Sequence, residues 1–224
     1  MKIAIMQPYF FPYIGYFQLI NAVDTFVIYD DIKYTKKGWI NRNNLSDNIK
    51  ITIPIKKASN TLDIRERKLS DDWHQQKKKI INKVNNKYIS ENYYSEVNKI
   101  FSTVINYESL NLFDFIYNSI KQINSYLGIK TKIVISSELN RDRKLKCQDS
   151  VLQICRILKA KQYINPIGGQ DLYDHKYFKS NSIKLNFIKM NKLDVSNDYV
   201  SILDLLFKYD RPHLKNQLNK YIMI

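Results

Sequence analysis

The first thirty residues place two buried strands around one short helix, and this arrangement limits the fold more than any other feature. Lys2–Met6 is a short apolar run that stops at Gln7 and Pro8. Ile14–Ala22 has apolar residues at helical spacing, and Phe26–Tyr29 is a β-branched and aromatic run typical of a buried strand. A strand, a helix and a strand in this order predict a βαβ unit with parallel strands.

Short apolar runs alternate with helical patterns along the rest of the chain. Further strands are expected at Lys50–Ile55, Lys132–Ser136, Gln162–Asn165 and Ile183–Met190, and helices at 72–107, 112–127, 150–158 and from Ser201 onward. This alternation predicts an α/β fold with a Rossmann-like parallel sheet flanked by helices. No linker rich in Pro, Gly or Ser divides the 224 residues, so we expect a single domain over 1–224, with a helical insertion at roughly 72–127.

The bulk composition narrows the class of protein. The net charge is +15, but Lys and Arg are dispersed, with only short dense runs at Arg65–Lys68 and Lys77–Lys79. A dispersed charge favours solvated faces over a nucleic-acid arm, so nucleic acid is not the expected partner. No apolar run approaches the ~20 residues of a membrane helix, and the N-terminus lacks the pattern of a signal peptide. We therefore expect a cytoplasmic protein without membrane insertion.

A loop framed by Pro8 and Pro12 carries a dense group of aromatic residues to the end of the first strand. Ligands of open α/β sheets bind at the carboxyl ends of the strands. The rings in this loop either plug that edge of the sheet or form a platform on which a planar ring stacks. Under the second interpretation, the substrate-binding residues are Gln7, Tyr9, Phe10, Tyr13, Gly15 and Tyr16.

The end of the second strand supplies carboxylates and a cluster of cations and amides. If the strand continues, Asp30 and Asp31 point to opposite sides, so only one can face a ligand, and we expect it to be Asp30, as a general base or an acceptor for sugar hydroxyls. The guanidinium of an arginine matches phosphate or carboxylate oxygens in a fork. The binding candidates that follow are Lys37, Trp39, Asn41 and Arg42, against the alternative of a polar turn with a surface arginine.

A third candidate segment follows the strand at 162–165. Adjacent glycines after a strand let backbone N–H groups face an anion, although a tight turn alone also explains them. The candidates here are Asn165, Gly168, Gly169 and Tyr173. His74 at a helix start is a second acid–base candidate, and the alternative is an ordinary surface histidine. The three histidines do not have metal-ligand spacing, and neither do Cys147 and Cys155.

Three blocks of this sequence together resemble the WbqC-like protein family. The first comprises Gln7–Phe17, Asp24, Val27–Asp31 and Trp39–Asn43, the second Tyr163–Pro166 with Gly168, Gly169, Leu172 and Tyr173, and the third Tyr199–Phe207. The resemblance implies a role in making surface polysaccharide, including O-antigen, and modified nucleotide sugars. A fainter likeness to nucleotidyltransferase-like proteins lies at Gly15, but Tyr16 replaces the histidine of that pattern.

Three functions follow as hypotheses. The first is an enzyme of polysaccharide biosynthesis, a transferase that acts on a nucleotide-linked sugar by N-acyl transfer to the sugar amine, with an acyl thioester as the donor class. The second is an adenylate-forming or nucleotidyl-transfer enzyme on the same Rossmann-like sheet, with Asp30 or Asp31 near a metal. The third is a basic nucleic-acid-binding module. The sugar, the donor and whether copies form a homo-oligomer stay open at this stage.

Overall fold

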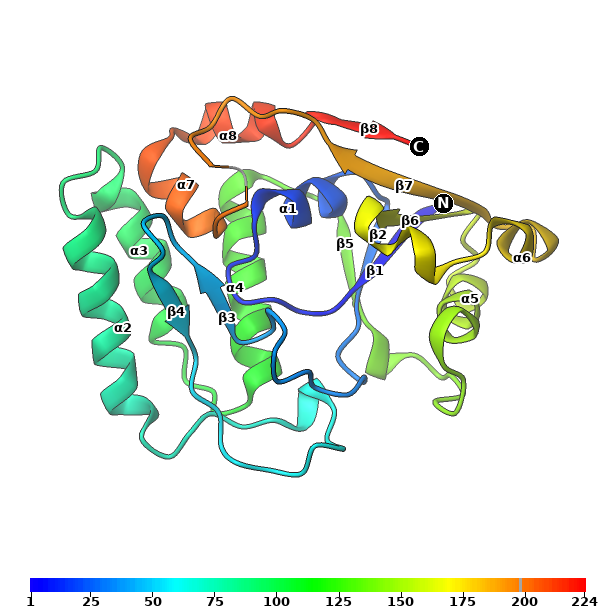
Figure 1. Cartoon of the computed structure of the whole chain (residues 1–224), viewed down its shortest axis with the longest axis horizontal. Helices are drawn as coiled ribbons and strands as arrows, with labels where there is room; N and C mark the ends of the chain where they lie inside the picture. Colours follow the sequence, from blue (N-terminus) through cyan, green and yellow to red (C-terminus); the bar gives the residue numbers. More distant parts are fainter. Residues whose placement is uncertain (198) are drawn as a thin grey trace.

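A six-stranded sheet forms the centre of the molecule, as seen in a computed structural model that describes residues 1–197 and 199–224 (Figure 1). The strand order is β5-β2-β1-β6-β7-β8. The strands are β1 (Lys2–Met6), β2 (Thr25–Ile28), β5 (Lys132–Ile135), β6 (Gln162–Pro166), β7 (Lys184–Met190) and β8 (Tyr221–Met223). The first five are parallel and β8 is antiparallel to β7, so the prediction of an α/β fold with a largely parallel sheet is confirmed.

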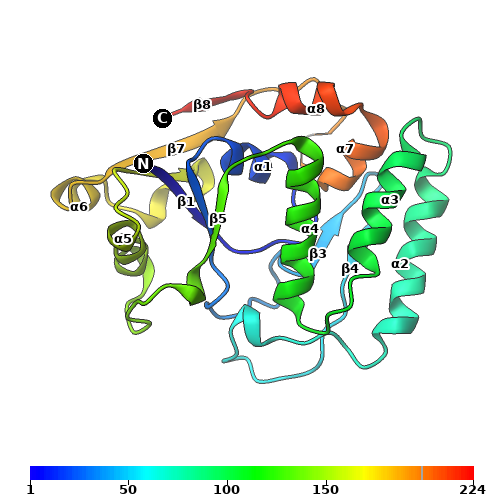
Figure 2. The same ribbon diagram turned by 180° about the vertical axis from the view of Figure 1, so that it is seen from behind.

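The direction of strand order reverses between β1 and β6. The chain builds outward from β1 through β2 to β5, returns to β6 beside β1, and then continues to β7. The crossovers between β1 and β5 lie on one face of the sheet, and the crossovers from β5 to β6 and from β6 to β7 lie on the other (Figures 1 and 2). This reversal is the topological switch point at which open α/β sheets bind ligands.

Period-two alternation along the strands gives the sheet two apolar faces. Ala4, Phe26 and Ile164 face α1 (Ile14–Asn21), α4 (Leu112–Leu127), α7 (Ile202–Lys208) and α8 (Arg211–Gln217), whereas Ile5, Val27 and Tyr163 face α5 (Cys147–Ile157) and α6 (His175–Ser180). A strand buried on both faces reads as a continuous apolar run, which is why β1 and β2 are recognisable from sequence.

The segment between β2 and β5 extends the first face. It contains the hairpin of β3 (Arg42–Asn44) and β4 (Lys50–Thr52), the short 3-10 helix η1 (Ile64–Glu66), and then α2 (Trp73–Tyr88), α3 (Tyr94–Ile105) and α4. These three helices lie side by side beyond the sheet (Figure 2). The interpretation of 72–127 as an inserted lobe stays a prediction. Within the described residues, none of the helices has the length and apolar character needed to span a bilayer.

Two local predictions about helix ends are confirmed, whereas the strands β3 and β8 and the helix α6 were not expected. Gly128 ends α4 in the left-handed conformation with φ of 72°, and the Ser201 side chain caps α7 by accepting from the N–H of Leu203. The strand β8 was not predicted, because three residues carry too little pattern and the antiparallel pairing with β7 defines it.

Candidate functional site

A cavity of about 960 Å³ opens at the carboxyl ends of β1, β2 and β6, at the switch point of the sheet. Its wall draws on segments from Ile5 to Tyr173. We call it the strand-end cavity. The polar residues in its wall are Gln7, Tyr9, Tyr29, Asp31, Lys33, Asp63, Arg141, Arg143, Lys146, Cys147, Gln148, Asn165, Asp171 and Tyr173.

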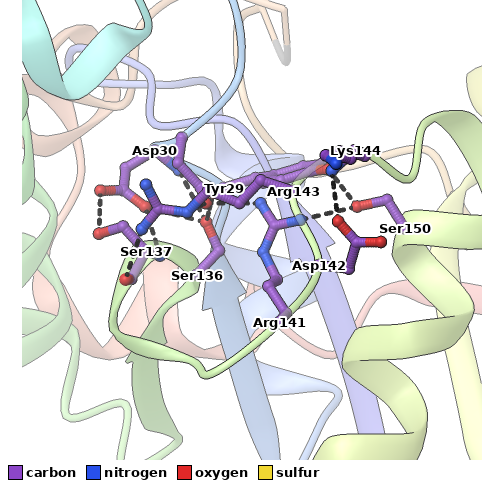
Figure 3. A network of polar contacts seen from close by, with 10 residues as sticks. Tyr29, Asp30, Ser136, Ser137, Arg141, Asp142, Arg143, Lys144 and Ser150 are labelled. Atoms are coloured by element: carbon purple, nitrogen blue, oxygen red, sulfur yellow. Dashed lines mark hydrogen bonds and ion pairs between the residues drawn. The ribbon is translucent and has the colours of Figure 1, made fainter.

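A buried ion pair lies in this wall. An Nη atom of Arg141 lies 2.6 Å from a carboxylate oxygen of Asp31, and the two side chains are 2% and 0% exposed. The same guanidinium donates to Ser150 Oγ at 3.0 Å and lies 5.2 Å from the ring centroid of Tyr29, whose hydroxyl also contacts Ser150 (Figure 3). The contacts fix Arg141 in one orientation, so it contributes a positioned positive charge to the cavity.

Asp30 and Asp31 converge on the loop after β5 instead of pointing to opposite sides. β2 ends at Ile28, so the strand alternation stops before the two carboxylates, and the hydroxyl of Ser136 lies within hydrogen-bond reach of both. Asp30 also accepts from the N–H and the hydroxyl of Ser137 at 3.0 and 2.7 Å and is 1% exposed (Figure 3). Asp30 is therefore a structural junction of β2 and β5, and it is Asp31 that reaches the cavity.

Exposed cations and the carboxyl group of Asp63 add further charge to the cavity wall. Lys33, Arg143 and Lys146 have exposed side chains in its wall. Lys146 is the N-cap residue of α5, and its side chain makes no capping hydrogen bond. The first turn of α5 also lies in the wall of the cavity. Helix starts favour anions through their free N–H groups. Burial raises the pKa of Asp63, and the neighbouring Glu66 carboxylate adds to the rise.

The end of β6 forms the polar wall on the opposite side of the switch point. Asn165 is buried and donates to Tyr163 Oη at 2.7 Å, and Tyr163 in turn contacts the Tyr173 hydroxyl. Burial raises the pKa of both phenols, so both are neutral hydrogen-bonding groups at neutral pH. The loop that carries Gly169 is packed directly on Asn165.

The two adjacent glycines differ sharply in the space around them, which predicts opposite outcomes for one substitution. A Cβ at Gly169 would lie 2.2 Å from Asn165 Oδ1, whereas a Cβ at Gly168 meets nothing within 4 Å. We expect Gly169→Ala to cost about 1–3 kcal/mol of unfolding free energy and to weaken ligand binding. Gly168→Ala should stay within about 0.5 kcal/mol. Urea unfolding of both variants checks this, and equal effects would contradict it.

Six residues singled out from the sequence lie in the wall of the strand-end cavity: Gln7, Tyr9, Asn165, Gly168, Gly169 and Tyr173. They come from the ends of β1 and β6, on the two sides of the switch point. The structure thus brings together two of the three candidate segments expected at the strand ends. The candidates of the other segment, which are Asp30, Lys37, Trp39, Asn41 and Arg42, do not line this cavity.

Most of the aromatic loop is structural support. Phe10 is fully buried in the core. The carbonyl oxygen of Phe11, a residue with a positive φ of 41°, accepts from the Asn43 amide at 2.7 Å and from the Ser201 hydroxyl at 2.8 Å. Two distant segments therefore meet at this loop and hold its strained backbone. The buried Tyr16 donates to the carbonyl oxygen of Gln7 at 3.0 Å, which helps to position the cavity end of the loop.

Tyr13 and Gly15 lie where this loop joins α1, Tyr13 at the N-cap position and Gly15 buried in the first turn. The Tyr13 ring packs over Gly15, where a Cβ would come within 2.3 Å of a ring carbon, and it stacks on Tyr199 with a centroid distance of 6.1 Å. Neither residue lines the strand-end cavity. The missing side chain of Gly15 therefore makes room for the ring of Tyr13 and not for a ligand.

The remaining sequence candidates lie elsewhere. Asn41 and Arg42 line a separate cavity beside the β3–β4 hairpin. Lys37, Trp39 and His74 are exposed and contribute nothing to the strand-end cavity, His74 because it lies in the first turn of α2.

The strand-end cavity contains several charged residues that the sequence did not single out. These are Lys33, Asp63, Arg141, Arg143 and Lys146. The run Arg141–Lys144 comes shortly after the strand predicted at Lys132–Ser136, separated from it by a short polar segment. This position at the carboxyl end of a strand could have identified the run as part of the site.

The protein is an α/β protein with a cation-lined cavity at the switch point of its sheet, the position at which open α/β sheets bind ligands. The chain belongs to the WbqC-like protein family, whose family model matches residues 7–215. It is 30% identical over 223 residues to the uncharacterized protein Rv1507c of Mycobacterium tuberculosis, an alignment that covers 92% of this chain and 93% of that relative. No solved structure gives a significant match.

Proposed function

We propose that the protein acts in surface glycan biosynthesis by binding a nucleotide-linked amino sugar in the strand-end cavity and transferring an acyl group to the sugar amine. The observation that carries the proposal is the location of a cation-lined cavity of about 960 Å³ at the switch point of the sheet. Open α/β sheets bind nucleotides at this position. Membership of the WbqC-like family supports the glycan context.

The cavity wall offers a partner for each part of such a substrate. Arg143 and Lys146, beside the start of α5, would bind the diphosphate. Tyr9 and Tyr173 would contact the base through their rings. The Gln7 amide would orient sugar hydroxyls. Nucleotide sugars are cytoplasmic metabolites, which agrees with the location expected from the sequence.

We assign the general base to Asp63, because Asp30 is enclosed by Ser136 and Ser137 and Asp31 is paired with Arg141. Asp63 lies in the cavity wall, and its raised pKa makes it a stronger base than an exposed aspartate. Asp63 would take the proton from the sugar ammonium. The amine nitrogen then attacks the thioester carbonyl carbon, the new C–N bond forms and the C–S bond breaks. The leaving thiolate takes the second proton from the nitrogen, so the products are the amide and a free thiol.

The binding step is tested by calorimetric titration with uridine, thymidine and guanosine diphosphate sugars. Arg143→Ala should weaken the binding by about tenfold or more, because one charge-assisted contact is worth about 1.5–3 kcal/mol. The matched control is Lys144→Ala, which removes the same charge from a neighbour outside the cavity wall. Absence of binding at millimolar concentrations, or equal effects of the two variants, would contradict the assignment.

The transfer step is tested by mass spectrometry of the sugar nucleotide after incubation with an acyl thioester. Asp63→Asn should lower turnover by about 100-fold or more while nucleotide-sugar binding is retained. Asp142→Asn, an exposed carboxylate outside the cavity wall, is the control. An Asp63→Asn variant with full turnover would remove Asp63 from the role of base.

A second candidate function is adenylate-forming or nucleotidyl-transfer chemistry. The observation that favours it is the strand order, which is that of dinucleotide-binding sheets. This function requires ATP binding that depends on Mg²⁺, whereas the acyl transfer does not. A thermal-shift titration with ATP, with and without Mg²⁺, separates the two candidates.

A further inference from the structure

A second cavity, of about 690 Å³, lies beside the β3–β4 hairpin and is strongly basic. We call it the hairpin cavity. Its wall contains no aspartate or glutamate, in contrast to the strand-end cavity, which has Asp31, Asp63 and Asp171. The cations in its wall are Lys36, Arg42, Lys56, Lys57 and Arg67.

Arg67 is the unusual member of this group, because its guanidinium is buried without an acceptor. The residue is 2% exposed, and its Nε and Nη2 atoms are buried and have no hydrogen-bond partner. Across residues 1–197 and 199–224, no carboxylate pairs with it. Its Cζ atom lies 4.9 Å from the ring centroid of Tyr34. This cation–π contact helps to position the guanidinium, but the ring does not accept hydrogen bonds from the N–H groups at its edge.

Arg42 adds a second free donor to the same wall. One of its Nη atoms donates to the carbonyl oxygen of Lys36, while its Nε is buried and without a partner. Tyr34 and Asn41 support this side of the cavity through a 2.8 Å bond between the Tyr34 hydroxyl and the Asn41 side-chain oxygen. Both arginines therefore line the cavity, are held by their neighbours and carry buried N–H groups without an acceptor.

A buried guanidinium keeps its charge, and leaving that charge without an acceptor is costly. We propose that the hairpin cavity binds the phosphoryl group of a small molecule, with Arg67 and Arg42 as the buried donors. Arginine forks match phosphate oxygens in geometry, and the exposed lysines supply attraction at the mouth. The cavity has room for the group that carries the phosphate. This proposal does not depend on the function of the strand-end cavity.

The test is a calorimetric and thermal-shift titration of the full chain with inorganic phosphate, adenosine 5′-monophosphate and adenosine, at constant ionic strength set with chloride. Both anions should bind and adenosine should not. Arg67→Met should weaken anion binding by about tenfold or more, whereas Arg156→Met, an exposed arginine far along the chain, should change it less than about twofold. Without anion, Arg67→Met should unfold at the same or a higher temperature, because it removes an unpaired buried charge.

The arms of the experiment separate the sources of the phosphoryl group and the two cavities. Tighter binding of the nucleotide than of phosphate identifies a phosphorylated organic molecule, and equal binding identifies free phosphate. Loss of anion binding in Arg143→Met but not in Arg67→Met would place the anion in the strand-end cavity and overturn the proposal, as would absence of saturable binding. If Arg67→Met does not fold, Arg42→Met decides, and unchanged anion affinity in that variant overturns the proposal.

Discussion

Replacement of Asp204 by alanine should lower the free energy of unfolding by about 3–5 kcal/mol. Asp204 is fully buried on α7 and accepts from the hydroxyl of Tyr88 and from both the N–H and the hydroxyl of Ser46. It also pairs with Lys208 at 3.0 Å. The carboxylate therefore joins α7 to α2 and to the turn between β3 and β4, and its removal leaves these groups without their acceptor. Urea unfolding at neutral pH measures the loss.

The control for this substitution is Asp171→Ala, an exposed aspartate that should change stability by less than about 0.5 kcal/mol. The effect of Asp204→Ala should also depend on pH. Burial acts to raise the pKa of Asp204, but the hydrogen bonds from Tyr88 and Ser46 outweigh it, so the pKa is lowered. The stabilisation is present above about pH 4, the unfolded-state pKa. It is lost as the pH falls through the lower folded-state pKa, and a difference between the proteins that persists unchanged in strong acid would contradict this reasoning.

Replacement of Arg141 by methionine should cost a similar amount, about 3–5 kcal/mol, because it leaves the Asp31 carboxylate buried without its main partner. Arg143 lies 3.5 Å from the same carboxylate oxygen, but its side chain is 47% exposed and can compensate only in part. Equilibrium unfolding by two probes, fluorescence and circular dichroism, measures the change.

A double-mutant cycle distinguishes the ion pair from simple loss of packing. The double variant Asp31→Asn with Arg141→Met should recover part of the stability lost in Arg141→Met, because no unpaired charge is then buried. Arg143→Met is the matched single control and should cost less than about 1 kcal/mol, since Arg143 is itself half exposed and its distance to Asp31 is longer than that of Arg141. If the effects of Asp31→Asn and Arg141→Met on the unfolding free energy simply add in the double variant, the two side chains are not energetically coupled.

The sequence predicts the sheet of this protein well, because its central strands are buried on both faces. Such strands appear as runs of apolar residues that need no partner to be recognised, as at β1 and β2. The helix ends at Gly128 and Ser201 are equally local, since each depends on one residue's own conformation or side chain. β8 lacks such information, because its three residues are defined by pairing with β7.

The candidate site is predicted only in part, for a physical reason that differs between its two sides. Gln7 directly follows β1, Asn165 is near the end of β6 and Gly169 comes shortly after it, so the rule that parallel strands end at one edge places them correctly. Arg141 reaches Asp31 through the path of a long loop, which the local pattern does not specify. The expected choice of Asp30 over Asp31 assumed that β2 continues, whereas the chain bends after Ile28.

The wall of the strand-end cavity runs from Ile5 to Tyr173, and this has a consequence for the order of events during synthesis. An emerging polypeptide on the ribosome cannot present this pocket until β6 and the glycine turn have left the exit tunnel and docked beside β1. A ligand of this pocket, as proposed above, would therefore stabilise only chains in which β6 has already paired with β1.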